Sequence, residues 1–473
     1  MIFKTVPEIE YLLQEIDNLI RNNASNIEFE KIYKDYVIKY PILKNYTLIV
    51  GTNDTSNNYF HRTIPTFLNE KTFFDYNINK KVNVNHYWFE FSNIIYLSNK
   101  VVDGLPTFDS TVFVDSNAMN IIDNFRQSPQ DYKNSFLDFK IKYDIDLNYL
   151  PYLLEDYINP EHESFNLNKT KSKIESFEIV NNLDKEFYYK TGQIRIDQKK
   201  LEAEGYKTFE AFINDKLFYF ANNFFERKDC KFISLPKSTV LVTSDKNDLK
   251  FNDFFSMYNL IYGYVLNILI EKYKNNSIES KLNNILRNMY LNGQKLSQIL
   301  FFSYILFTKE NEYKLNKFFN IDIALSSYEE ILKKTRNITW DIFLYTMSQD
   351  FIVQPLRKNN NIEYRADFGI PLFLTMDEKF YNAFIRFCPI QIIIVDESTK
   401  ERPYLSINTK TYEHNEFINI LKDFDDKNKD ISKLKERIFK KYIKNNIIYS
   451  IRRQFREKME RELKYLLKDK FNK

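Results

Sequence analysis

Length and composition predict a large folded protein with more than one part. The 473 residues are about three times the usual length of one domain, which predicts two or three domains, or one domain with a large insertion. Hydrophobic residues make up 44% of the chain and aromatic residues 17%, which argues against disorder. The net charge of +4 is uneven, because residues 421–473 hold 18 Lys and Arg against 9 Asp and Glu.

Residue types that mark several enzyme classes are scarce. The 7 glycines stand apart from one another, so the chain has no glycine-rich loop of the kind that binds phosphates or dinucleotides. Cys230 and Cys388 are distant and the 4 histidines are scattered, which argues against a zinc site, a histidine-metal cluster and a disulfide framework. A catalytic site is therefore expected to rely on carboxylates.

Residues 1–105 are predicted to form an N-terminal α/β module. A helical pattern of apolar residues runs from Ile9 to Ile20, and short β-rich runs follow at Tyr46–Val50 and Tyr87–Phe91. Lys4 and Glu8 interrupt what would be the apolar part of a secretory signal, and no apolar stretch is long enough to cross a bilayer. We therefore expect a cytoplasmic protein without a membrane partner.

The first segment that suggests chemistry is Thr111–Asn117. A run of β-branched and aromatic residues ends at Asp115, and Ser116, Asn117 and a helix-like stretch follow. This pattern puts a carboxylate at the carboxyl end of a buried strand, where α/β sheets bind ligands. The alternative is that Asp115 or Ser116 only caps the next helix.

Two further acids lie in predicted helices. Tyr149–Asp156 is typical of a helix entered through Pro151, and it carries Glu155. Residues 165–335 show long helical periodicities and are predicted to form a helical insertion that supplies no metal ligand. After it, Arg336–Asp341 places Asp341 in the first turn of a helix, with Thr339 as its cap. Each acid also has a structural explanation, as a solvated side chain or a partner of the helix dipole.

A second strand that ends in Asp lies at Pro371–Asp377. Thr375 and Asp377 close the strand, a helix follows over Glu378–Phe387, and a strong strand follows at Ile390–Val395, which predicts a β-α-β unit. Two such strands can bring both carboxylates to one edge of a sheet, and a hard divalent cation prefers a cluster of oxygens. We expect Asp115 and Asp377 to end adjacent or near-adjacent parallel strands.

Taken in chain order, these segments resemble the PIN-like nuclease superfamily. The resemblance implies a three-layer α/β/α sandwich with a central, mainly parallel sheet, and cleavage of RNA, or less often DNA, with Mg2+ or Mn2+. It implies four metal-binding catalytic acids and two supporting residues, namely Asp115, Glu155, Asp341 and Asp377 with Asn117 and Thr375. Arg336 and Lys379 are expected to bind the flanking phosphates.

The resemblance also suggests how the chain is divided. The two parts of the PIN-like domain are expected at 106–164 and 336–400, on either side of the helical insertion. Other acids compete for the same roles: Asp156, Glu161 or Glu163 for Glu155, and Asp350, Glu363 or Asp367 for the last ligand positions.

Residues 401–473 are predicted to form a basic, amphipathic C-terminal helical region. From Ile431 onward, apolar residues recur at helical spacing with Lys and Arg among them. This pattern favours a helix that docks on the protein, on a second copy or on a protein partner. The alternative is a helix that binds nucleic acid through Arg452, Arg453 and Arg456.

Other functions compete with a metal-dependent ribonuclease. One is a catalytically inactive PIN-like protein that binds or regulates a partner. A restriction-type site at Val395–Lys400 is less favoured, because the spacing from Glu397 to Lys400 is one residue too long. A HEPN-type ribonuclease needs an Arg and a His four to six residues apart on one helix, and no Arg precedes a His at that spacing. Antiviral defence and RNA processing remain hypotheses for the setting.

Overall fold

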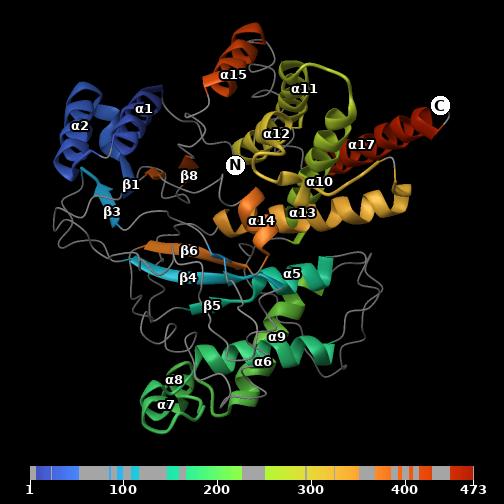
Figure 1. Ribbon diagram of the computed structural model, residues 1–473. Helices are drawn as coiled ribbons and strands as arrows, with labels where there is room; N and C mark the ends of the chain where they lie inside the picture. Colours follow the sequence, from blue (N-terminus) through green and yellow to red (C-terminus); the bar gives the residue numbers. More distant parts are fainter. Residues whose placement is uncertain are drawn as a thin grey trace.

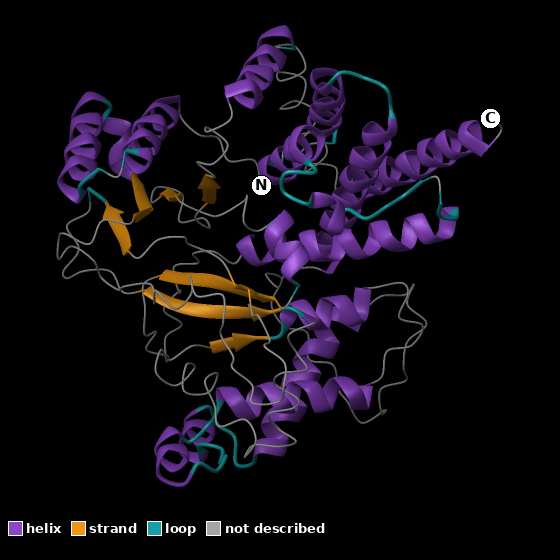
Figure 2. Ribbon diagram, in the orientation of Figure 1, coloured by secondary structure: helices purple, strands orange, loops and turns teal. Residues whose placement is uncertain are grey.

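The structure is predominantly helical. The computed structural model describes residues 7–22, 24–52, 85–86, 93–99, 108–116, 146–158, 167–225, 251–292, 296–323, 325–350, 368–375, 377–384, 392–396, 404–407, 415–428 and 448–471 (Figure 1). Most of these residues lie in helices, and the strands are short and divided between two four-stranded sheets (Figure 2).

The first sheet belongs to the N-terminal part of the chain. Its strand order is β3-β1-β7-β8, with every pair antiparallel. The strands are β1 (Tyr46–Thr52), β3 (Asn93–Leu97), β7 (Ile392–Asp396) and β8 (Tyr404–Ile407), accompanied by α1 (Pro7–Arg21), α2 (Asn26–Lys39) and the short 3₁₀ helix η1 (Pro41–Asn45). A separate small core joins α1, α2 and β1 to Ile394 of β7. The helix predicted at Ile9–Ile20 and the strand at Tyr46–Val50 are confirmed, whereas Tyr87–Phe91 lies outside the described residues.

The second sheet carries the two strands that the sequence singled out. Its order is β2-β6-β4-β5, from β2 (Asn85–His86), β4 (Phe108–Val114), β5 (Asp146–Asn148) and β6 (Phe368–Thr375). β4 pairs in parallel with both β5 and β6, and the short β2 is antiparallel to β6. The prediction that Asp115 and Asp377 follow adjacent parallel strands is therefore confirmed.

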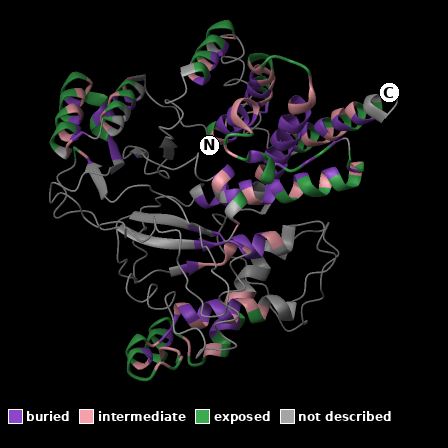
Figure 3. Ribbon diagram, in the orientation of Figure 1, coloured by how far each residue is buried: buried purple, intermediate pink, exposed green. Residues whose placement is uncertain are grey.

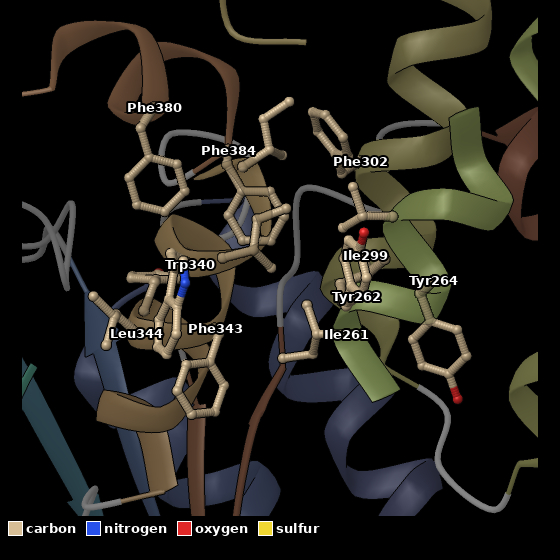
Figure 4. Close-up of a cluster of buried hydrophobic side chains, with 14 of the residues drawn as sticks. Ile261, Tyr262, Tyr264, Ile299, Phe302, Trp340, Phe343, Leu344, Phe380 and Phe384 are labelled. Atoms are coloured by element: carbon tan, nitrogen blue, oxygen red, sulfur yellow. The ribbon is translucent and has the colours of Figure 1, made fainter. Parts of the chain in front are cut away.

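Helices supply most of the main core, which also contains Phe113 and Val114 of β4, Leu147 of β5 and Phe373 of β6. The helices are α5 (Leu150–Ile158), α6 (Leu167–Asn181), α7 (Lys185–Thr191), α8 (Gln198–Ala203), α9 (Phe209–Phe225), α10 (Phe251–Tyr273), α11 (Ile278–Leu291), α12 (Ser297–Lys309), the 3₁₀ helix η4 (Leu315–Lys317), α13 (Tyr328–Asp350), α14 (Glu378–Ala383), α15 (Asn415–Lys427) and α17 (Ile448–Phe471). Buried residues are concentrated on α10, α12 and α13 (Figure 3). Figure 4 shows side chains of these helices packed with those of α14. Over its described residues, the region 165–335 is helical as predicted and contributes no strand to either sheet.

The predicted three-layer α/β/α sandwich with a central sheet is wrong. The strands do not form one central sheet, because β7 pairs with β1 of the N-terminal sheet and not with β4 or β6. The predicted β-α-β unit therefore does not form: β6, α14 and β7 follow one another in the chain, but β6 and β7 lie in different sheets. The long apolar periodicities of the sequence belong to helices that pack on one another, and these helices supply most residues of the main core.

The C-terminal helix α17 packs against α10, as Figure 1 also shows. Its apolar residues Phe455, Met459, Leu463 and Leu467 are buried in the helical core. The approach is close at Gly263, where an added Cβ would lie 2.5 Å from the Phe455 ring. The prediction of a docked amphipathic helix is confirmed for residues 448–471. Among the described helices, none has the length and apolar character needed to span a bilayer.

Candidate acidic active site

The site begins where β4 and β6 end side by side. Asp115 follows β4 directly and is 2% exposed. Its Oδ1 accepts a 2.7 Å hydrogen bond from the Ser116 backbone N–H, and its Oδ2 accepts a 2.7 Å bond from the Thr375 hydroxyl at the end of β6. The sequence predicted Thr375 only as a neighbour of Asp377, but the parallel pairing of β4 with β6 makes it the direct partner of Asp115.

Asp377 is joined to the same hydrogen-bonded chain. Its backbone N–H donates to the Thr375 oxygen at 3.0 Å, while Thr375 donates onward to Asp115. The Asp377 Oδ1 caps α14 by accepting from the backbone N–H groups of Lys379 and Phe380 at 2.7 and 3.0 Å. Asp377 is thus both a helix cap and a member of the acid cluster, so the structural and functional explanations of this residue are compatible.

Glu155 reaches the cluster from α5, as the sequence predicted. The helix begins at Leu150, whose N–H donates to Asn148 Oδ1 at 2.9 Å. Leu153 and Leu154 are buried and fix one face of α5 in the core, while Glu155 is only half-buried. This carboxylate raises the pKa of Asp115, so the two groups lie within electrostatic reach of each other.

Asp341 joins the cluster from the middle of α13, not from a first helical turn. The prediction that Thr339 caps the helix is wrong, because the Thr339 hydroxyl donates to the Thr335 carbonyl within the helix. The helix begins at Tyr328, after a reciprocal cap in which the Glu330 side chain accepts from the Ser327 N–H and the Ser327 hydroxyl accepts from the Glu330 N–H. This Ser-x-x-Glu signal was present in the sequence and sets the true start of α13.

The four predicted acids influence one another electrostatically. Burial, followed by the charge of Glu155, raises the pKa of Asp115 to about 7, and Asp377 adds to the shift. Hydrogen bonds from Thr375 and Ser116 act in the opposite direction. Burial and the charges of Asp115, Asp377 and Glu155, in that order, raise the pKa of Asp341 well above its ordinary value. The structure thus places Glu155, Asp341 and Asp377 within electrostatic reach of Asp115.

The chemistry of these side chains fits Mg2+ or Mn2+. Carboxylates within electrostatic reach of one another repel when ionised, and a divalent cation relieves that repulsion while taking oxygen ligands. Among the described residues, no three His, Cys, Asp or Glu side chains already stand at the spacing of a metal site. The acids that would hold the ion are Asp115, Glu155, Asp341 and Asp377.

Three of the basic residues predicted to bind nucleic acid contact other parts of the protein. Arg452 is 6% exposed and donates to Ser256, and Arg456 donates to Asn259 at 2.9 Å, so both serve the packing of α17 on α10. Burial raises the pKa of Glu460 on α17, and the charges of Arg456 and Arg336 act in the opposite direction.

Two predicted basic residues remain at the surface. Arg453 is exposed but paired with Glu457 at 2.9 Å. Lys379 is exposed in the first turn of α14, two residues after Asp377, and is the predicted phosphate-binding residue beside the acids.

Several predicted candidates lie where the structure describes no side chain. Asn117, Glu161, Glu163, Glu363 and Asp367 fall outside the described residues, as do Glu397 and Lys400 of the restriction-type alternative. Asp156 and Asp350 lie within α5 and at the end of α13, but their side chains are not described.

Comparison with known proteins adds no family. No protein-family model matches the chain, and no curated protein and no solved structure matches it. The resemblance to PIN-like nucleases therefore rests on the acidic residues and the elements that carry them.

Proposed function

We propose that this chain is a metal-dependent nuclease that hydrolyses phosphodiester bonds, with RNA as the expected substrate and DNA as the second choice. The observation that supports the proposal is the convergence of Asp115, Glu155, Asp341 and Asp377, whose charges raise the pKa values of two of them. Strongly perturbed pKa values cluster at functional sites. The preference for RNA follows from the PIN-like resemblance.

The position of each side chain at the site suggests its role in the proposed reaction. When bound, Mg2+ or Mn2+ would polarise a water molecule and neutralise charge on the scissile phosphate. Asp115 is held in place, because each of its oxygens accepts a hydrogen bond. Thr375 favours the ionised form of Asp115, which is the form that binds a cation. Lys379, exposed beside Asp377, would contact a phosphate flanking the cleaved bond.

The test is cleavage of end-labelled single-stranded RNA, structured RNA and DNA by the purified chain with Mn2+, Mg2+ or EDTA. Cleavage should require the ion and should be lost in Asp115→Asn and Asp377→Asn. Asp197→Asn is the matched control, because Asp197 caps α8 through its side chain as Asp377 caps α14.

The pattern of loss separates the competing explanations. Asn is an effective helix cap, so loss of cleavage in Asp377→Asn but not in Asp197→Asn would point to the charge and not to the cap. Cleavage that survives EDTA and both substitutions at the acid site would refute the proposal. If the wild-type chain cleaves no nucleic acid, the inactive binding or regulatory protein becomes the better explanation.

A further inference from the structure

The edge of the second sheet is closed by a side chain of α6. The strand β5 has only three residues and pairs with β4 on one side. On its other side, the Asn181 amide bonds both backbone groups of Leu147: the Leu147 N–H donates to Asn181 Oδ1 at 3.0 Å, and Asn181 Nδ2 donates to the Leu147 carbonyl at 2.9 Å. The amide therefore occupies the place of a neighbouring strand, which matters because so short an edge strand is weakly held by itself.

A second contact from the same helix holds the chain two residues later. The Tyr149 hydroxyl donates to Glu178 Oε1 at 2.9 Å, and its ring packs on Phe177 with centroids 5.2 Å apart. Glu178 is 6% exposed, and its other oxygen accepts from Asn182 Nδ2 at 3.1 Å. A buried carboxylate is costly unless it is hydrogen-bonded, so this network specifies one position for Tyr149.

These contacts surround the start of the helix that carries Glu155. Leu147 and Tyr149 flank Asn148, whose side chain accepts from the N–H of Leu150, the first residue of α5. Glu155 follows five residues further along the same short helix. Any shift of β5 or of the α5 start therefore moves the Glu155 carboxylate relative to Asp115, which directly follows the neighbouring strand β4.

We propose that Asn181 and Glu178 are positioning residues, which hold β5 and the start of α5 so that Glu155 faces Asp115. The inference rests on the proposed function of the acid cluster. It gives the helical region 165–335 a role at the site, although the described residues of that region supply no acid to the cluster. Neither residue touches the reacting groups, and both act through Glu155.

The test uses Asn181→Leu, which keeps the branched shape of the side chain and removes both bonds to Leu147. Ile174→Val is the control, because Ile174 lies on the buried face of the same helix and the change weakens packing without touching the two contacts. In cleavage assays, Asn181→Leu should lower kcat on the order of a hundredfold with little change in KM, as expected for a misplaced catalytic group. The double variant Asn181→Leu/Glu155→Gln should be no slower than Glu155→Gln alone, because the effect passes through Glu155.

A second measurement does not depend on cleavage. The titration of the Asp115 carboxyl is followed by carbon-13 NMR in EDTA. Glu155→Gln should lower the Asp115 titration midpoint, since the Glu155 charge raises it. Asn181→Leu should shift the midpoint in the same direction, and the double variant should match Glu155→Gln. If Asn181→Leu fails to fold, Tyr149→Phe removes a single bond to Glu178 and should produce a smaller shift of the same sign.

The outcomes separate the two ideas. If Asn181→Leu and Tyr149→Phe leave the Asp115 midpoint at its wild-type value, α5 is held by its own packing and the positioning role is refuted. If the midpoint shifts as expected but the wild-type chain cleaves no nucleic acid, the nuclease proposal fails while the positioning role stands. Equal losses in Asn181→Leu and Ile174→Val would also count against the positioning role, since they would reflect stability alone.

Discussion

The raised pKa of Asp115 makes a specific prediction about stability in the absence of metal. Folding raises the pKa of this carboxyl from 3.8 to about 7. Well below pH 4 the carboxyl is protonated in both the folded and the unfolded chain, and burial of the neutral form costs little free energy. As the pH rises from 4 to 7, the unfolded chain releases a proton that the folded chain still holds. Asp115 therefore destabilises the fold increasingly over this window, and the loss is complete above pH 7.

The magnitude follows from the size of the shift. About three pKa units at about 1.4 kcal/mol each give a penalty of about 4 kcal/mol at pH 8. Asp115→Asn removes the penalty, but it also removes the charged acceptor for Thr375, which costs about 1 kcal/mol. The metal-free variant should therefore be about 3 kcal/mol more stable than wild type at pH 8. At pH 5 most of that gain should be absent.

Urea denaturation in EDTA at pH 5 and pH 8 measures this difference, with Asp197→Asn as the control for the substitution itself. Added Mg2+ or Mn2+ should then stabilise the wild-type protein at pH 8 and have little effect on Asp115→Asn, because a ligand stabilises only the state that binds it. A difference between Asp115→Asn and wild type that does not change with pH would refute the reasoning. It would mean that Asp115 stays ionised in the metal-free fold and that the acids do not strain one another.

Two further predictions follow from individual contacts. In wild type, the hydrogen bond from Thr375 stabilises the ionised form of Asp115. Thr375→Val removes this bond and should raise the pH of half-maximal metal-dependent cleavage by about one unit. Thr375→Ser keeps the hydroxyl and should keep the wild-type pH profile. Arg452→Ala should lower the free energy of unfolding in urea by about 1–3 kcal/mol, since it leaves the buried Ser256 hydroxyl without its donor, while Arg453→Ala should change it by less than about 0.5 kcal/mol. Equal pH profiles for the two Thr375 variants, or equal stabilities for the two Arg variants, would contradict these predictions.

The site was more predictable than the fold because its signals are local. A strand that ends in Asp is visible in a few residues, and two such strands sufficed to predict the pairing of β4 with β6. Which sheet a strand joins is not local information. The apolar run that became β7 fits a parallel neighbour of β6 as well as it fits an antiparallel neighbour of β1, and long-range packing of the N-terminal core decides between them.

The errors at α13 and α17 have different physical causes. At α13 the Ser327-x-x-Glu330 cap is present in the sequence, but Thr339 lies closer to Asp341 and is also a residue type that caps helices. At α17 the helical period predicted the buried apolar face, yet the fate of each cation was not in the pattern. Arg452 is buried because Ser256 of α10 offers a hydrogen-bond partner, and that partner lies 196 residues away in the chain.

A full α/β/α sandwich is not required to bring these four acids near one another. The adjacent parallel strands β4 and β6 position Asp115 and Asp377, because their register places both residues beyond the carboxyl ends of the two strands. The other two acids need only helices that are held firmly beside that edge. Asp341 meets this need on α13, where the next residue toward the N-terminus, Trp340, is 2% exposed in the helical core. Glu155 meets it on α5, whose start is bound to α6 through Leu147 and Tyr149. Packing in the helical core thus positions Asp341 and Glu155, as the strands and layers of an α/β/α sandwich would do.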